Sequence, residues 1–184
     1  MIDKIYLDVK EKYKDRYDRF LHILGVRDTA VMLAKRYHVD EKRAEIAALF
    51  HDYTKYDDKA YQMSFLTQEE LKKYEGFEVM YHAISASRLL EQKYEIHDPE
   101  ILSAIYNHVW GKPKMSLLDK IILIADKTEP SRNFLLVDEL RKLSFESLDL
   151  AIIKYLEDYK LHVKNEGYNY PLEVDSIIQE LKGV

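Results

Sequence analysis

Six histidine and aspartate residues are spaced along the chain in an order that suits metal binding. They are His22, the adjacent pair His51 and Asp52, then His82, His108 and Asp126. Imidazole and carboxylate groups are ligands of divalent transition metals, and six such groups can hold two ions. Two metal ions close together lower the pKa of a shared water and offset the charge of a phosphate group. The pattern therefore favours hydrolysis of a phosphate compound.

The four histidines of this set share small or apolar neighbours. Three of them lie in segments that read as helices: His22 in RFLHILGV, His82 in MYHAIS and His108 in AIYNHVWG. A single histidine on an apolar helix face is more often a core residue than a ligand. The shared setting of these four histidines is what favours a metal site. The other three histidines have polar or helix-end neighbours and are interpreted as surface residues: His38, His97 and His162.

The two aspartates of the set are also expected to be buried. His51 and Asp52 end the run AEIAALFHD, and Asp126 follows the apolar run KIILIA. Burial of an ionised carboxylate is costly unless a cation accompanies it. The alternative for the pair is an exposed helix end or a capping role, and the alternative for Asp126 is a salt bridge between helices. The partners available for that salt bridge are Lys120, Lys127 and Arg132.

Apolar residues at spacings of three and four predict helices through almost the whole chain, and therefore an all-α fold. The length of 184 residues suits one domain with a substantial core, and no linker or repeat divides it. The metal site would lie between helices of this single bundle. The helices are expected at about residues 16–37, 40–51, 79–94, 98–108, 116–130, 135–143, 145–165 and 172–182, with a short one after Thr67.

Several of these helices begin with a capping signal. Asp40, Asp98 and Ser116 are predicted N-caps, because a short polar side chain can accept hydrogen bonds from the first free backbone amides of a helix. Thr67, with Glu70 three residues later, predicts a capping box.

The composition excludes several classes of protein. A net charge of −5 argues against general affinity for nucleic acid or anionic membranes. The absence of cysteine excludes disulfides and thiol catalysis. The first 19 residues are too charged for a signal peptide, and no apolar run approaches the roughly 20 residues of a membrane span. We expect a cytoplasmic protein, and the fifteen tyrosines favour a homodimer.

Three longer segments resemble a known family. They are RFLHILGV at residues 19–26, HDYTK at 51–55 and NHVWGKPKMSLLDKIILIADKTEPSR at 107–132. Together they resemble the HD-domain metal-dependent phosphohydrolase superfamily and, within it, the bacterial YqeK-type subfamily. The matching motifs fall within about residues 16–140, and residues from about 145 to 182 are expected to add C-terminal helices to the same single HD domain.

The resemblance implies a reaction and a ligand set. Such proteins are all-α, bind two metal ions that are typically iron, and hydrolyse diadenosine tetraphosphate symmetrically to two ADP. By this resemblance, Asp52 would bridge the two metals, with His22, His51 and Asp126 on the first and His82 and His108 on the second. Residue type alone also permits manganese, nickel, cobalt or zinc.

Basic residues near these ligands are candidates for binding the phosphates of a nucleotide or dinucleoside polyphosphate. Arg19 and Lys55 each lie about one helical turn from a candidate ligand, and Arg132 follows the helix of the last aspartate. Asp52 and Lys55 are the expected catalytic residues. For each basic residue, the alternative is an ordinary surface charge or ion pair.

The loop after His108 supplies further candidates and departs from the resemblance. The family often has threonine and arginine where this chain has Val109 and Lys112. Lysine keeps the positive charge but lacks the forked geometry with which arginine binds phosphate. Trp110 and Gly111 complete the predicted substrate contacts. Trp110 would stack on a base, and the alternative is a hydrophobic plug between helices.

Two other functions fit the same residues. The metal site could serve a different substrate, such as a nucleoside monophosphate, a cyclic dinucleotide or an alarmone. A nucleotide-binding regulatory module with a vestigial metal site is the weaker alternative, because all six ligand-type residues are present.

Overall fold

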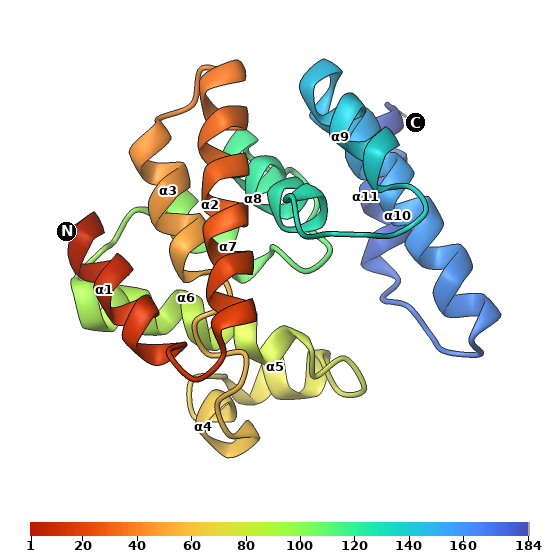
Figure 1. Ribbon diagram of the computed structural model, residues 1–184. Coiled ribbons are helices and arrows are strands. Elements are labelled where there is room, and N and C mark those ends of the chain that lie inside the picture. Colours follow the sequence, from red (N-terminus) through yellow and green to blue (C-terminus); the bar gives the residue numbers. More distant parts are fainter. Residues whose placement is uncertain (184) are drawn as a thin grey trace.

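Helices make up most of the protein in the computed structural model (Figure 1). The structure describes residues 1–183, and no β-strand occurs among them. The helices in this range are α1 (Ile2–Lys12), α2 (Tyr17–Arg36), α3 (Glu41–Phe50), α4 (Lys59–Met63), α5 (Gln68–Lys73), α6 (Met80–Tyr94), α7 (Pro99–Tyr106), α8 (Leu117–Thr128), α9 (Val137–Glu146), α10 (Leu148–Asn165) and α11 (Glu173–Lys182). The expected all-α fold is confirmed.

The centre of the molecule is built from α2, α3 and α8, which pack against one another. On α2, the side chains of Ile23, Val26, Ala30 and Leu33 recur at spacings of three and four and are fully buried. Small side chains such as Ala47 on α3 let neighbouring helices approach closely. Each large aliphatic side chain stabilises the fold by about 1.5–3 kcal/mol when it is fully buried. This packing fixes the helices from which the candidate ligands project.

The predicted helix caps are confirmed. Asp40 and Asp98 each accept hydrogen bonds from two backbone amides, at the starts of α3 and α7. Ser116 caps α8, and Thr67 forms the expected capping box with Glu70 at the start of α5. These caps satisfy amides that have no partner within their own helix.

Some helix boundaries differ from the prediction. The helix expected to reach His108 ends at Tyr106, because the chain turns at Asn107, whose carbonyl accepts a hydrogen bond from the amide of Gly111 at 2.8 Å. His108 therefore lies in the turn that follows α7. The helix expected at residues 135–143 is shifted toward the C-terminus and spans Val137–Glu146.

Two helices, α1 and α4, are absent from the sequence prediction. The sequence of α1 is strongly charged, and the helix buries only Ile5 and Val9, which are one turn apart. α4 has only five residues, and Gln62 is its buried side chain. Both segments have too few buried apolar residues for a helix to be identified from their spacing.

The last three helices, α9, α10 and α11, lie together on one side of the molecule (Figure 1). α10 packs against α9 and α11 and also against α8, which joins these helices to the central ones. None of the helices described is both long enough and apolar enough to cross a membrane.

Candidate metal centre

All six predicted ligands converge in the interior of the protein. They project from α2, from the chain just after α3 and α7, and from α6 and α8. Their exposed fractions run from 0% to 6%. Ligand atoms lie within 4.8 Å of one another in three groups: His22, His51 and Asp52; His51, His108 and Asp126; and Asp52, His82 and His108.

Asp52 lies at the centre of this cluster, and its two oxygens face different histidines. Oδ2 is 3.4 Å from Nε2 of His51 and 3.7 Å from Nε2 of His22. Oδ1 is 3.0 Å from Nε2 of His82 and 3.5 Å from Nε2 of His108. One carboxylate therefore joins two separate pairs of imidazole groups.

Asp126 completes the first of these two groups. Its Oδ1 lies 3.1 Å from Nε2 of His22 and 3.8 Å from Nε2 of His51. The cluster thus has two carboxylates and two histidines on one side, and the shared carboxylate with two further histidines on the other.

Three histidines donate a hydrogen bond through Nδ1, so their Nε2 atoms are acceptors, and Nε2 of His108 also lies 3.2 Å from Nε2 of His82. Nδ1 of His51 donates to the carbonyl of Ala48 at 2.7 Å, and Nδ1 of His108 donates to the carbonyl of Ile105 at 2.7 Å. Nδ1 of His22 donates to a carboxylate at 2.9 Å. A neutral imidazole that donates through Nδ1 is an acceptor at Nε2. These acceptors face the oxygens of aspartates, which are acceptors as well, and a cation between them would satisfy both.

Two buried nitrogen atoms support the same conclusion. Nε2 of His22 and Nε2 of His51 are buried, and neither has a hydrogen-bond partner among the described residues. Such groups are costly in an interior unless a ligand satisfies them. The donor set of imidazoles and carboxylates fits a divalent transition metal.

The protonation states also suit metal binding. Burial alone would raise the pKa of Asp52, but its contacts with His51, His108 and His82 hold that pKa well below its usual range. Burial likewise opposes ionisation of Asp126, and the charge of Lys127 holds its pKa well below the usual range. Burial lowers the pKa of His82. Ionised carboxylates and neutral imidazoles are the forms that bind metals.

Glu129, which sequence reasoning did not select, is the partner of His22. Its side chain is 1% exposed, and Oε1 lies 2.9 Å from Nδ1 of His22. The backbone amide of Ser131 donates to Oε2 at 2.7 Å and fixes the carboxylate. A Cβ atom at Gly25 would lie 2.5 Å from Oε2, so the absence of a side chain there makes room for Glu129. The motif ADKTEPSR contains this glutamate, but sequence alone gives it no partner.

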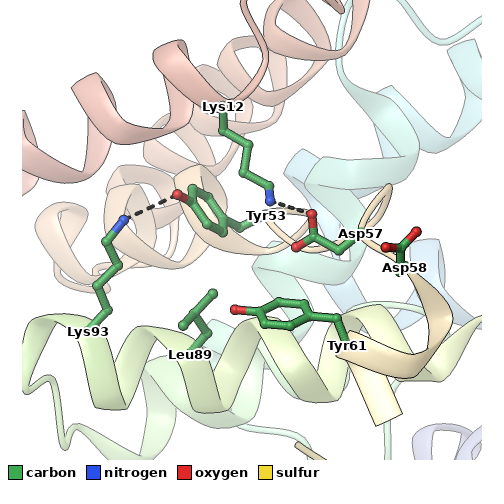
Figure 2. Close-up of a pocket in the computed structure, with 7 residues that line it drawn as sticks. All are labelled: Lys12, Tyr53, Asp57, Asp58, Tyr61, Leu89 and Lys93. Carbon is green, nitrogen blue, oxygen red and sulfur yellow. Dashed lines mark hydrogen bonds and ion pairs between the residues drawn. The ribbon is translucent and has the colours of Figure 1, made fainter. Parts of the chain in front are cut away.

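Contacts of Tyr13 and Tyr53 hold the segment that carries Asp52 in place. The hydroxyl of Tyr13 donates to the backbone carbonyl of Asp52 at 2.6 Å. Lys93 donates to the hydroxyl of Tyr53 at 3.2 Å, and Lys12 lies with its Nζ 4.9 Å from the centre of the Tyr53 ring. Figure 2 shows these lysines on either side of Tyr53, around a cavity of about 450 Å³. These contacts join α1 and α6 to the chain that follows α3.

Four basic side chains contact the two aspartates. Nη1 of Arg19 lies 2.9 Å from Oδ2 of Asp52, and Nζ of Lys55 lies 3.0 Å from the same oxygen. At the other aspartate, Nη2 of Arg132 is 2.5 Å from Oδ1 and Nζ of Lys127 is 2.6 Å from Oδ2. Two of the residues considered as salt-bridge partners thus contact Asp126, but Lys127 is on the same helix and Arg132 follows it, so the bridge does not join two helices. Lys127 was not among the predicted phosphate ligands.

A cavity of about 550 Å³ opens beside this centre, and we call it the mouth cavity. Arg19, His22, Glu129 and Arg132 line part of it. Two arginines and one candidate metal ligand, His22, thus meet at this opening beside the carboxylates of Asp18 and Glu129.

The loop residues predicted to contact substrate do not line the mouth cavity. Trp110 is 2% exposed, and its ring centre lies 6.0 Å from that of Phe77. Gly111 adopts a φ of +88°, which glycine tolerates best. Nζ of Lys112 lies 3.6 Å from the carboxylate of Asp119. Trp110 fills space between helices here, and contact of these three residues with substrate stays a prediction.

Comparison with known proteins identifies the family. The model of the HD domain matches residues 19–131, a range that contains all six candidate ligands. The chain belongs to the HD domain family. The predicted extension of this HD domain to the whole chain lies beyond the matched range and stays a prediction.

Relatives of this HD domain protein match most of the chain. It is 35% identical to the symmetrical bis(5'-nucleosyl)-tetraphosphatase of Bacillus subtilis (strain 168), over 87% of this chain and 86% of the relative. It is 41% identical to the enzyme of the same name from Halalkalibacterium halodurans, over 75% of each chain. The predicted resemblance to HD phosphohydrolases is confirmed.

A solved structure has the same fold. It is the crystal structure of a predicted HD superfamily hydrolase, described as involved in NAD metabolism, from Clostridium acetobutylicum. The TM-score is 0.89 at 32% sequence identity, and the match covers 100% of this chain and 97% of the other. The likeness thus includes the helices outside the range matched by the family model.

Proposed function

We propose that this protein hydrolyses diadenosine tetraphosphate symmetrically to two ADP, with two divalent metal ions at the centre described above. Relatives named symmetrical bis(5'-nucleosyl)-tetraphosphatase match three quarters or more of the chain. In the structure, the proposal rests on Asp52, whose two oxygens face separate pairs of histidines. A carboxylate in this position is suited to bridging two cations.

The residues present would hold two ions in different surroundings. His22, His51 and Asp126 would hold one ion, His82 and His108 would hold the other, and Asp52 would contact both. Such ions, when bound, supply Lewis acidity that lowers the pKa of water and offsets the charge of phosphate oxygens. We propose iron as the metal, and manganese, nickel, cobalt and zinc suit the same donors.

The basic residues would hold the polyphosphate. Arg19, Lys55, Lys127 and Arg132 are paired with the two aspartates in this structure. Divalent ions at the centre would compensate the charge of those aspartates, which would free the basic groups for an anionic substrate. Arginine binds phosphate through two parallel hydrogen bonds, so the two arginines would also orient the chain of phosphates.

Symmetrical cleavage sets a geometric requirement. Attack on one of the two inner phosphorus atoms places both nucleosides away from the metal centre. The mouth cavity has two arginines and one candidate metal ligand, His22, in its lining, and we infer that it holds phosphates rather than a base. A hydrolase of another nucleotide phosphate is the alternative, and the names of the relatives do not favour it.

The test is hydrolysis of diadenosine tetraphosphate by protein purified without chelator, with and without added ferrous iron. The products are separated by chromatography. ADP as the sole nucleotide product would support the proposal. ATP with AMP would contradict symmetrical cleavage, and no turnover by protein with bound metal would contradict this substrate.

A further inference from the structure

A second cavity lies next to the mouth cavity, between the end of α8 and α10. It has a volume of about 360 Å³ and shares Arg132 and Phe134 with the mouth cavity. Tyr155 and Tyr159 of α10 also line it, with ring centres 6.3 Å apart and ring planes 24° apart. Two roughly parallel aromatic rings therefore stand beside the opening that leads to the metal centre.

Two basic residues connect this second cavity with the metal centre. Nζ of Lys127 lies 2.6 Å from a carboxylate oxygen of Asp126 and 5.5 Å from the centre of the Tyr155 ring. Arg132 lines both cavities and contacts the same aspartate. A ligand on the tyrosines would thus have positive charge between itself and the candidate metal ligands.

The lining of the second cavity suits a nucleoside. Aromatic side chains bind bases by stacking, and every type of base can stack in this way. Asp158 offers carboxylate oxygens that can accept hydrogen bonds from ribose hydroxyls or an exocyclic amine. A volume of about 360 Å³ is within the range of small-molecule sites.

We propose that this second cavity binds one nucleoside end of a nucleotide substrate. The base would stack on Tyr155 and Tyr159, and Lys127 and Arg132 would contact the adjoining phosphates. This proposal rests on the proposed function, because it assumes a substrate in which a nucleoside is joined to phosphates at the metal centre. α10 lies outside residues 19–131, so the nucleoside site would come partly from the chain beyond the range that the family model matches.

The experiment compares Tyr155→Leu and Tyr159→Leu with wild type, and uses Tyr168→Leu as a control because Tyr168 is 73% exposed. Calorimetry measures the binding of ADP and, separately, of inorganic diphosphate to each metal-loaded protein. Each cavity variant should bind ADP about tenfold more weakly, as loss of base stacking predicts. Diphosphate affinity should not change, and the control should match wild type with both ligands.

Two results would overturn the proposal. One is ADP affinity equal to wild type in both cavity variants. The other is a parallel loss of ADP and diphosphate affinity, because that would mean a disturbed metal centre instead of a lost base contact. Hydrolysis of diadenosine tetraphosphate by the wild type tests the proposed function separately. Hydrolysis to ADP combined with tyrosine-independent ADP binding would reject only the nucleoside site.

Discussion

The carboxylate of Glu129 lies 2.9 Å from Nδ1 of His22, although 107 residues separate the two in the chain. The ionised carboxylate accepts a hydrogen bond from the N–H group at Nδ1, so Nε2 of His22 is left as the nitrogen that faces Asp126. A carboxylate behind a ligating histidine orients the ring and raises its basicity. Glu129 therefore positions a candidate ligand without being one.

Replacement of Glu129 should weaken metal binding more than it weakens the fold. Glu129→Gln keeps an oxygen that can accept a hydrogen bond from Nδ1 but removes the negative charge, and Glu129→Ala removes both. Loss of such a partner typically lowers metal affinity by about 10–100-fold, so we expect Ala to be more severe than Gln. Titration of the metal-free proteins with ferrous or manganous ion measures this.

The exposed residue Glu146 provides the control for that experiment, as Glu146→Gln. If Glu129→Ala bound metal as tightly as this control, Glu129 would not orient His22 for binding. Circular dichroism of each variant separates lost affinity from lost folding.

The effect of Gly25→Ala on stability should depend on residue 129: destabilising with glutamate there and stabilising with alanine. In a helix, alanine is favoured over glycine by about 0.5–1 kcal/mol. With Glu129 present, the new Cβ would lie 2.5 Å from Oε2, so we expect Gly25→Ala to destabilise the protein. In the Glu129→Ala background this clash is absent, and Gly25→Ala should be stabilising. Urea unfolding of the four proteins gives both differences, and equal signs would contradict the close contact.

The elements that the sequence predicts well are those whose signals are local. The caps at Asp40, Asp98 and Ser116 depend on residues within one turn, and each is present in the structure. The burial of Asp126 follows from the apolar run KIILIA before it. The convergence of the six candidate ligands was inferred from shared settings and from a family resemblance, and the structure brings them together.

The features that sequence reasoning missed depend on contacts between distant parts of the chain. Glu129 and Gly25 acquire their roles only because the end of α8 meets α2. α7 ends before His108 because the chain turns there, and the spacing of apolar residues does not predict that turn. For Trp110, the sequence allowed both a base contact and a plug, and only packing against neighbouring aromatic rings places it in the interior.

The Asp98–Arg43 pair should make stability depend on pH in the acid range. A hydrogen bond from Arg43 lowers the pKa of Asp98 below its ordinary value of 3.8. A lowered pKa in the folded state means that the pair stabilises the protein above about 3.8, and that this contribution is lost as pH falls through the folded-state pKa. Asp98→Asn keeps an N-cap side chain but removes the charge.

Urea unfolding of wild type and Asp98→Asn from about pH 6 to about pH 2 tests this linkage. The wild type should be more stable at the higher pH, and the difference should shrink as pH falls. A difference that stays constant or grows with acidification would mean that the Arg43 pair does not contribute through ionised Asp98.

Substitutions of Asp52 and Lys55 should separate an effect on metal binding from an effect on hydrolysis of the substrate. Asp52→Ala removes the carboxylate that joins the two histidine pairs, so we expect loss of bound metal and of hydrolysis together. Lys55→Ala removes a basic group that contacts Asp52 from outside the ligand set, so metal content should be kept while kcat/KM falls. Metal analysis by mass spectrometry and steady-state kinetics measure the two effects.

Asp138→Ala is the matched control, because the Asp138 side chain is 85% exposed and far along the chain on α9. It should keep both metal and activity. If Asp52→Ala kept full metal content, the cluster of histidines and aspartates would not be the metal site. If Lys55→Ala lost metal in step with activity, Lys55 would support the centre itself, and the separation of ligands from phosphate-binding residues would fail.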